Sequence, residues 1–483
     1  MSVGRAILSS LIALSMAGCG GGGSGGGAST GGGNTGGGGG NTGTSPCSYA
    51  SRADWARQQI NEWYLFPNGV NLGANPSSFN SLQDYIDALV RPSVTPAAGG
   101  TGGPLERAGL TYITSIAEEN ALINSGSSAG FGIRLSYETD TNRVFVVEAF
   151  ESAPGYAAGM DRGTQLLAIE GRSVGEIMAS QGPAGVSDAL GPTQAGVTRS
   201  ITFRTAQGAQ VTTSITKADY PLDPVSDRYG IRILNDGNEQ VGYVNLRTFI
   251  VADAAQQLRD GFAQFRAAGI TKVILDFRYN GGGLVSVADL LTDLLLAKQV
   301  GNISSRMVLR PSKASENETT YINSQPQSIT ATRVAVIGRE GTASASELVA
   351  NNLIPYLGNN LALVGENTFG KPVGQFAFDR SACDDRLRAI AFKTVNAAGN
   401  GEYYGGLLSV IPNSCAARDD YAVQLGDPQE ASISKALDFL AGRSCTPIAA
   451  KADGITAQSV GSRSRIIRPE NPNAAQHDNP GLF

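Results

Sequence analysis

The stretch RVAVIGREGTASASELVANNL, residues 333–353, predicts a strand, a sharp turn and a helix. Its apolar, β-branched start is typical of a buried strand, and the glycines that follow break that strand. Ser344 stands at the turn, where its hydroxyl can be exposed beside the backbone N–H of Ala345 at the helix N-terminus. Such a turn suits a nucleophile with an oxyanion donor next to it.

The same serine has a second interpretation. Ser344 and Glu347, three residues apart, also fit a capping box that only satisfies helix N–H groups. A catalytic serine needs a base, and the one histidine of the chain, His477, lies in a polar segment near the end, where we expect it to be outside any active site. The composition therefore argues against a Ser-His-Asp triad, a His-dependent cysteine peptidase and a His-rich zinc site. A lysine base is the remaining variant.

Lys371 is the candidate base. Residues 361–364 predict the next buried strand, and Lys371 lies in the turn-rich loop that leaves it. If this strand and 334–337 are parallel neighbours joined by the helix, both loops leave the same edge of the sheet. A free lysine has a pKa of about 10.4, so a lysine base must be desolvated. The alternative is an ordinary surface lysine.

A glycine-rich turn lies upstream. Residues 273–278 predict another buried strand, and glycines 281–283 separate it from a long apolar helix over 284–297. Glycine allows positive φ and close backbone approach, as an oxyanion-hole amide requires, although any tight turn could use it as well.

Together these motifs resemble the carboxyl-terminal processing, or tail-specific, serine peptidases, a Ser-Lys family. The resemblance rests on GTASASE at 341–347, TFGK at 368–371 and LDFRYNGGG at 275–283, and it covers roughly residues 130–442. It implies that Ser344 is the nucleophile and Lys371 the base. The resemblance also implies that Gln375 and Glu347 hold the lysine and the helix in place. It further implies that the backbone N–H groups of Ala345 and Gly282 bind the oxyanion.

The N-terminal residues predict export and anchoring. Residues 1–18 combine a short charged start with an apolar run too short to span a bilayer, which is typical of a signal peptide. Residues 15–19 resemble a bacterial lipoprotein box, which implies that Cys19 carries lipid; a plain signal peptide with a spare cysteine is the alternative. The Gly-rich linker at 19–45 cannot bury a core. We therefore expect a cell-envelope protein held on a lipid bilayer.

Four further segments complete the predicted organisation. We expect a small helical domain at 46–126, a PDZ domain at 127–218, an α/β peptidase core with a mixed sheet and crossover helices at 219–446, and a disordered tail at 447–483. The PDZ resemblance implies that Gly130, Phe131, Gly132 and Ile133 form a loop that binds a peptide's C-terminal carboxylate, with the peptide adding a strand. A β-rich spacer is the alternative.

Composition restricts the partners. With 483 residues, 41% of them hydrophobic, the chain can bury a large core, and its net charge of −5 argues against nucleic acid. We expect no cofactor and no metal.

Four cysteines remain besides Cys19, and in an exported protein they predict two disulfides. Of the three possible pairings we predict Cys383 with Cys415, flanking strands of one sheet, and Cys47 with Cys445, joining the two ends of the globular body.

The sequence therefore predicts a membrane-tethered serine endopeptidase whose partners are polypeptides, bound through their C-termini, and a lipid bilayer. The alternative is a non-catalytic envelope lipoprotein that only binds peptides.

Overall fold

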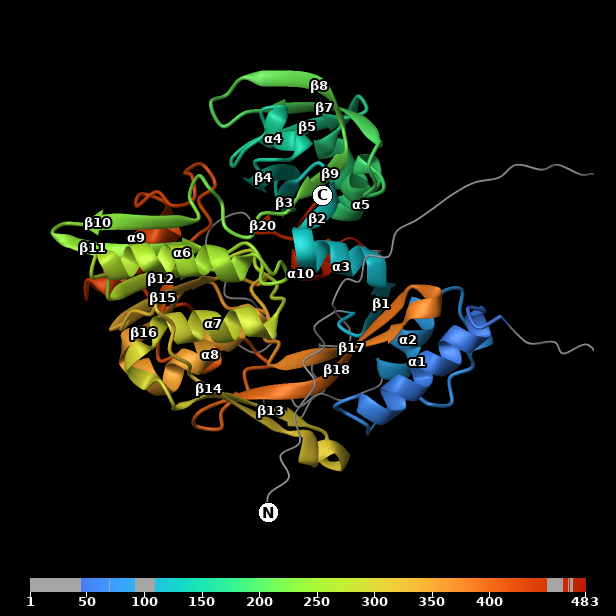
Figure 1. Ribbon diagram of the computed structural model, residues 1–483. Helices are drawn as coiled ribbons and strands as arrows, with labels where there is room; N and C mark the ends of the chain where they lie inside the picture. The colour runs from blue at the N-terminus through green and yellow to red at the C-terminus, as the bar shows by residue number, and fades with distance from the viewer. Residues whose placement is uncertain (1–44, 69, 92–108, 450–463, 468, 470–471) are drawn as a thin grey trace, which may run out of the picture. The chain divides into compact units, whose positions relative to one another are not determined.

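The central sheet places the predicted site loops at one edge. The computed structural model describes residues 45–68, 70–91, 109–449, 464–467, 469 and 472–483. In order across the central sheet, the strands are β10 (Ile231–Asp236), β11 (Glu239–Asn245), β12 (Lys272–Asp276), β15 (Arg333–Gly338), β16 (Leu361–Gly365) and β19 (Asn413–Ala416) (Figure 1). All neighbours from β11 to β19 are parallel, and β10 is antiparallel to β11. The predicted α/β core with a mixed sheet is confirmed.

Helices cover both faces of this sheet, which explains why its strands are apolar without alternation. One face packs against α6 (Ala254–Ala267), α7 (Val285–Leu295) and α8 (Ala345–Leu357), and the other against α9 (Ala431–Leu440) (Figure 1). In α6 the buried side chains Leu258, Phe262 and Phe265 recur at helical spacing. The connections β11–β12, β12–β15 and β15–β16 each contain a crossover helix. Because these strands are parallel, the loops after β12, β15 and β16 leave the same edge.

A second sheet lies beside the core and carries the N-terminal helices. Its strands are β1 (Tyr112–Ser115), β13 (Ile303–Leu309), β14 (Glu318–Tyr321), β17 (Val373–Arg380) and β18 (Asp385–Asn396). The helices α1 (Tyr49–Trp63) and α2 (Leu82–Val90) share one apolar cluster with β17 and β18. The N–H of Leu65 also donates to the carbonyl of Ile390 at 2.9 Å. In the segment predicted as a small helical domain, 46–126, the apolar faces of α1 and α2 thus complete the core of this sheet.

The disulfides correct the predicted pairing. Cys47 bonds Cys383, and Cys415 bonds Cys445. Cys383 lies in the turn between β17 and β18 of the second sheet, whereas Cys415 lies in β19 of the central sheet. The predicted Cys383–Cys415 bond assumed one sheet for both residues, and that assumption is wrong. Cys19 and the predicted signal peptide and linker lie outside the described residues.

Residues 127–221 form a third, β-rich part. One sheet contains β3 (Ile133–Glu138), β4 (Arg143–Ala149), β5 (Gln165–Ile169), β6 (Arg172–Ser173), β7 (Thr198–Arg204) and β8 (Gln210–Thr216), and β2 (Ser127–Gly130) pairs with β9 (Ala218–Pro221). The helices α4 (Pro154–Ala157) and α5 (Val174–Leu190) belong to this part, and α3 (Ile116–Ser125) precedes it. We call residues 127–221 the β-rich domain.

The end of the chain is a further correction. The tail predicted to be disordered contains β20 (Ser464–Arg465), which pairs with β3, and α10 (Ala474–Asp478), which packs near α3. Its last residues are buried: Asn479, Leu482 and Phe483 are 0%, 2% and 3% exposed. The segment is polar in composition, and its few apolar contacts depend on the surface of other parts of the chain. Hydrophobic periodicity in the sequence therefore could not predict them.

Candidate active site

Ser344 occupies a strained turn between β15 and α8. Its backbone has φ 56° and ψ −117°, whereas an ordinary helix N-cap residue is extended. A left-handed φ is costly for a residue with a side chain and persists only where its surroundings enforce it. The neighbouring Ser346 differs, since it is fully buried and its hydroxyl donates to the carbonyl of Asn280 at 3.0 Å. Of these two serines, Ser344 has the exposure a nucleophile needs.

Lys371 lies on the loop that follows the neighbouring strand. β15 and β16 are parallel and in register to their last residues, Gly338 opposite Gly365. The prediction that the Ser344 and Lys371 loops leave one edge of a parallel sheet is thus confirmed. The Lys371 side chain is only 6% exposed, which is the desolvated setting that a lysine base requires.

Glu347 ties the two loops together. One of its carboxylate oxygens, Oε2, accepts the N–H of Ser344 at 3.2 Å and the N–H of Lys371 at 2.7 Å. The other, Oε1, accepts the hydroxyl of Thr368 at 2.6 Å and the N–H of Gly370 at 2.8 Å. The carboxylate therefore does more than cap α8, because it fixes the backbone of the lysine loop against the serine turn.

The same carboxyl group is fully buried, and burial raises its pKa to about 7 although these four hydrogen bonds lower it. A buried carboxyl group with a raised pKa, where two loops meet, is typical of a functional site.

Gln375 orients the lysine side chain. Lys371 Nζ donates to Gln375 Oε1 at 2.9 Å, and Gln375 Nε2 donates to the carbonyl of Leu110 at 2.5 Å. Because the amide nitrogen is committed to Leu110, the amide oxygen faces the lysine. Leu110 comes from the chain before β1, which is one part of the site that the sequence did not indicate.

The glycine turn after β12 contacts the serine. Gly282 has φ 117°, and a Cβ added to it would lie 2.7 Å from Ser344 Cβ and 3.1 Å from the backbone nitrogen of Ala345. A side chain therefore cannot be accommodated at this position, and the three backbones of the predicted oxyanion site do meet. The N–H of Gly282, however, donates to Asn280 Oδ1 at 2.9 Å, so one predicted oxyanion donor is already engaged.

A cavity of about 290 Å³ is lined by Gly281, Ala343, Phe369, Lys371, His477 and Pro480, among others. His477 was expected to lie away from any active site, and that expectation is wrong. Its ring stacks on Tyr112 with centroids 3.5 Å apart, and α10 brings it to the cavity wall. The histidine thus reaches the site through the packing of the tail.

A buried ion cluster beneath the site is a second feature that sequence reasoning missed. Arg278, which lies two residues after β12 and within the 275–283 motif, contacts Asp276, Glu430 and Asp419 at 2.7, 2.9 and 3.3 Å. Arg162 of the β-rich domain reaches Asp419 at 2.7 Å. Burial alone would raise the pKa of Asp419, but the surrounding arginines lower this pKa well below its usual range. An arginine at the end of an apolar strand was the only sequence signal of this cluster.

The predicted carboxylate loop, Gly130 to Ile133, lies at the start of β3. Gly132 has φ 67°, and a Cβ there would lie 2.0 Å from the Cβ of Ala153, so the turn demands glycine. The N–H of Ile133 donates to the main-chain oxygen of Phe483 at 3.2 Å. The loop is therefore in contact with the last residues of the chain itself.

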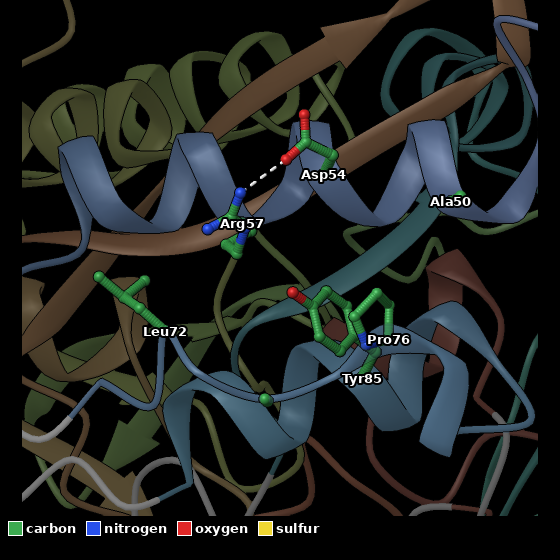
Figure 2. A pocket seen from close by; sticks show the side chains of 7 residues that line it. Ala50, Asp54, Arg57, Leu72, Pro76 and Tyr85 are labelled. Atoms are coloured by element: carbon green, nitrogen blue, oxygen red, sulfur yellow. Dashed lines mark hydrogen bonds and ion pairs between the residues drawn. The ribbon is translucent and has the colours of Figure 1, made fainter.

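Other features carry no chemistry. A depression between α1 and α2 is lined by Leu72, Pro76 and Tyr85, and its charged residues Arg57 and Asp54 pair with each other at 2.8 Å (Figure 2). Within the described ranges there is no group of three His, Cys, Asp or Glu side chains that could hold a metal ion. Nor does the part of the chain that the structure describes include a helix long and apolar enough to cross a bilayer.

Comparisons with known proteins point to one family. Residues 240–400 match the model of peptidase family S41. The chain is 28% identical over 257 residues to a carboxyl-terminal-processing protease of Picosynechococcus sp., covering 53% of this chain and 57% of that protein. It is 25% identical over 339 residues to the protein of the same name from Synechocystis sp., covering 70% and 73%.

A solved structure agrees in fold. A putative S41 protease from Bacteroides fragilis aligns with a TM-score of 0.60 and 21% identity, covering 80% of this chain and 97% of the other. The matched residues 240–400 contain the glycine turn, the serine turn and the lysine loop described above. Residues 240–400 of the chain thus match peptidase family S41, and the chain is similar over 53–70% of its length to carboxyl-terminal-processing proteases.

Proposed function

We propose that this chain is an exported serine endopeptidase in which Ser344 is the nucleophile and Lys371 the general base. The observation that carries the proposal is the single oxygen of Glu347 that accepts the N–H groups of both residues, at 3.2 and 2.7 Å. Gln375 supports it, because its amide oxygen holds the lysine amine at 2.9 Å. The relatives named above are proteases, which agrees with this chemistry.

The reaction follows from these positions. Ser344 Oγ attacks the carbonyl carbon of the scissile bond while Lys371 Nζ takes the hydroxyl proton, and the carbonyl π pair moves to the oxygen. When that pair returns, the C–N bond breaks and Lys371 gives the proton to the departing amine. Water then repeats the sequence on the acyl-serine, so that the enzyme is restored.

Stabilisation of the oxyanion is assigned to the N–H groups of Ala345 and Gly282, which the close packing of the glycine turn on the serine brings together. The N–H of Gly282 must exchange its bond with Asn280 Oδ1 for one with the oxyanion. We therefore propose that the N–H of Ala345 donates to the oxyanion directly. The N–H of Gly282 donates to it only after its bond to Asn280 Oδ1 is broken.

The substrates proposed are unstructured polypeptides captured through their C-termini. The β-rich domain would act as a PDZ domain, with residues 130–133 binding the terminal carboxylate and β3 accepting an added strand. The names of the cyanobacterial relatives, which describe carboxyl-terminal processing, agree with this substrate class.

Anchoring through lipidated Cys19 in the cell envelope is part of the same proposal. Mass spectrometry of the protein from membranes should find diacylated Cys19 as the first residue, and an unmodified Cys19 would remove the anchor from the proposal.

One gel tests the activity. Purified protein is incubated with an unfolded substrate, with Ser344→Ala alongside and Ser346→Ala as the matched control. Cleavage by the wild type and Ser346→Ala, but not by Ser344→Ala, is expected. An inactive wild type that still binds the substrate would favour the alternative of a non-catalytic peptide-binding lipoprotein.

A further inference from the structure

Residues 481–483 pair with the start of β3, on the same edge whose other end pairs with β20. The N–H of Phe483 donates to the carbonyl of Ile133 at 2.9 Å, and the N–H of Ile133 donates back to Phe483 at 3.2 Å. Two residues on, the N–H of Leu135 donates to the carbonyl of Gly481 at 2.8 Å. This alternating pattern is peptide recognition by strand addition, made here by the chain's own segment.

The side chain of Phe483 fills an apolar pocket of the β-rich domain. It is 3% exposed and belongs to the cluster that includes Phe131, Val186 and Leu190. The backbone of Phe483 approaches so closely that a Cβ on Gly130 would lie 3.0 Å from its carbonyl carbon. The pocket is therefore shaped for a large apolar side chain at the position next to the 130–133 loop.

The residues just before this strand lie against the catalytic loops. The N–H of Gly281 donates to the carbonyl of Asp478 at 3.0 Å. A Cβ on Gly281 or on Gly341 would lie 3.2 Å from the ring of Pro480. Gly281 adjoins Gly282, and Gly341 opens the serine turn. His477 and Pro480 of the segment also line the same cavity as Ala343 and Lys371.

The segment is also anchored upstream of the site. The N–H of Ala474 donates to Glu118 Oε1 at 3.0 Å, at the start of α3. Gln476, which is 1% exposed, donates through Nε2 to the carbonyl of Leu482 at 2.7 Å and so braces the added strand. Together with the stacking of His477 on Tyr112, these contacts hold the segment at several points.

We propose that residues 473–483 are an internal ligand that keeps the enzyme latent. This inference rests on the proposed function, since the groove is the one assigned to substrates. A substrate must displace the segment to reach the groove and the serine. The segment thereby excludes polypeptides whose ends do not compete for the pocket.

The size of the effect follows from the burial of one side chain. Loss of one buried phenylalanine shifts the equilibrium between the docked and the released segment by roughly 10- to 100-fold. Because apparent affinity scales with the fraction of molecules whose groove is open, Phe483→Asp should raise peptide affinity by that factor until the groove is fully open. Tyr321→Asp is the matched control, since Tyr321 lies on β14 and is 51% exposed.

The binding test is made in the Ser344→Ala protein, so that cleavage plays no part. The probe is the peptide Asn-Pro-Gly-Leu-Phe, labelled at its N-terminus, and fluorescence anisotropy gives its Kd. Tighter binding by at least about tenfold in Phe483→Asp, with no change in Tyr321→Asp, is expected. Equal Kd values in all three folded proteins would overturn the proposal.

A second measurement leaves the segment unaltered. Hydrogen–deuterium exchange of residues 479–483 in the Ser344→Ala protein should be slow alone and fast with saturating peptide. Peptide that binds without accelerating this exchange would overturn the proposal, because it would occupy another site.

Cleavage then separates the two proposals. Phe483→Asp that also keeps Ser344 should cleave an unfolded protein faster than the wild type. If affinity rises as expected but no protein cleaves, the internal ligand stands and the peptidase function fails. If cleavage occurs at the same rate in Phe483→Asp and the wild type while Kd is unchanged, the internal ligand fails and the peptidase function stands.

Discussion

The strained backbone of Ser344 is held by Glu347, three residues further along the chain. A non-glycine residue held in a sparsely populated backbone region costs on the order of 1–3 kcal/mol. Glu347 offsets part of this cost by accepting the N–H of Ser344, and it anchors the N–H of Lys371 with the same oxygen. A helix cap and a catalytic arrangement are therefore compatible uses of one carboxylate.

Substitution of the lysine tests the base. Lys371→Arg should lower kcat/KM by about 10⁴-fold or more, because guanidinium stays protonated and cannot take the serine proton. Ser344→Ala should lose as much, and the double variant hardly more, since the two residues act as a unit. Peptide cleavage by each folded variant is the measurement. A Lys371→Arg protein with near wild-type kcat/KM would exclude lysine as the base.

Glu347 predicts a dependence of stability on pH. Its pKa is about 7 in the folded protein against an ordinary 4.5, so between these values the folded state keeps a proton that the unfolded chain has released. The free energy of unfolding should fall by about 3 kcal/mol from this group as pH rises through that window.

Glu347→Gln removes the titration. Its amide N–H₂ would face two N–H donors, so the variant should be less stable throughout, yet its stability should change less between pH 4.5 and 7. Urea unfolding of both proteins at several pH values checks this. Parallel pH profiles for the two proteins would show that Glu347 does not titrate in this window.

At the scale of elements, the site depends on how closely the turn after β12 approaches the start of α8. Gly282→Ala would place a Cβ 2.7 Å from that of Ser344 and force the two turns apart. We expect kcat/KM to fall by about 100-fold or more, as when one oxyanion donor is lost. Gly405→Ala is the control, since a Cβ there meets nothing within 4 Å. Similar kcat/KM values for the two variants would contradict the assigned packing.

The disulfides tie elements that are far apart in the sequence. Peptide mapping without reduction should recover Cys47 with Cys383 and Cys415 with Cys445. The sequence separations are 336 and 30 residues, so loop-closure entropy favours the first bond by about 2 kcal/mol. Replacing Cys47 and Cys383 by serine should therefore lower Tm more than replacing the other pair. The opposite order would show that native contacts outweigh chain entropy.

For the whole molecule, the β-rich domain and the core share a buried ionic contact. Arg162 of that domain bonds Asp419 of the core at 2.7 Å and the hydroxyl of Tyr279 at 2.7 Å. A fully buried charge that loses its partner is strongly destabilising, so this contact favours one placement of the groove near the serine. The contact thereby fixes the position of the proposed peptide groove relative to Ser344.

That link predicts a dependence on the substrate's terminus. A peptide ending in phenylalanine should be cleaved faster as the free acid than as the amide, because amidation removes the charge that the N–H groups of residues 130–133 would bind. The ratio of kcat/KM for the two peptides is the measurement. Equal values would rule out capture through the carboxylate.

Local sequence was sufficient to predict the strands and turns that carry Ser344 and Lys371. Apolar runs broken by glycine predicted β12, β15 and β16, and parallel crossovers then required that Ser344 and Lys371 share one edge. These features depend on residues close together in the chain, and the motifs added the expected roles.

Tertiary structure alone decided the features that join distant residues. Cys47 meets Cys383, Gln375 meets Leu110, and Phe483 meets Ile133. None of these contacts leaves a periodic pattern, because each depends on one or two side chains and on the surface that another part of the chain offers. For that reason the polar tail gave no sign in the sequence that His477 and Pro480 would line a cavity together with Lys371.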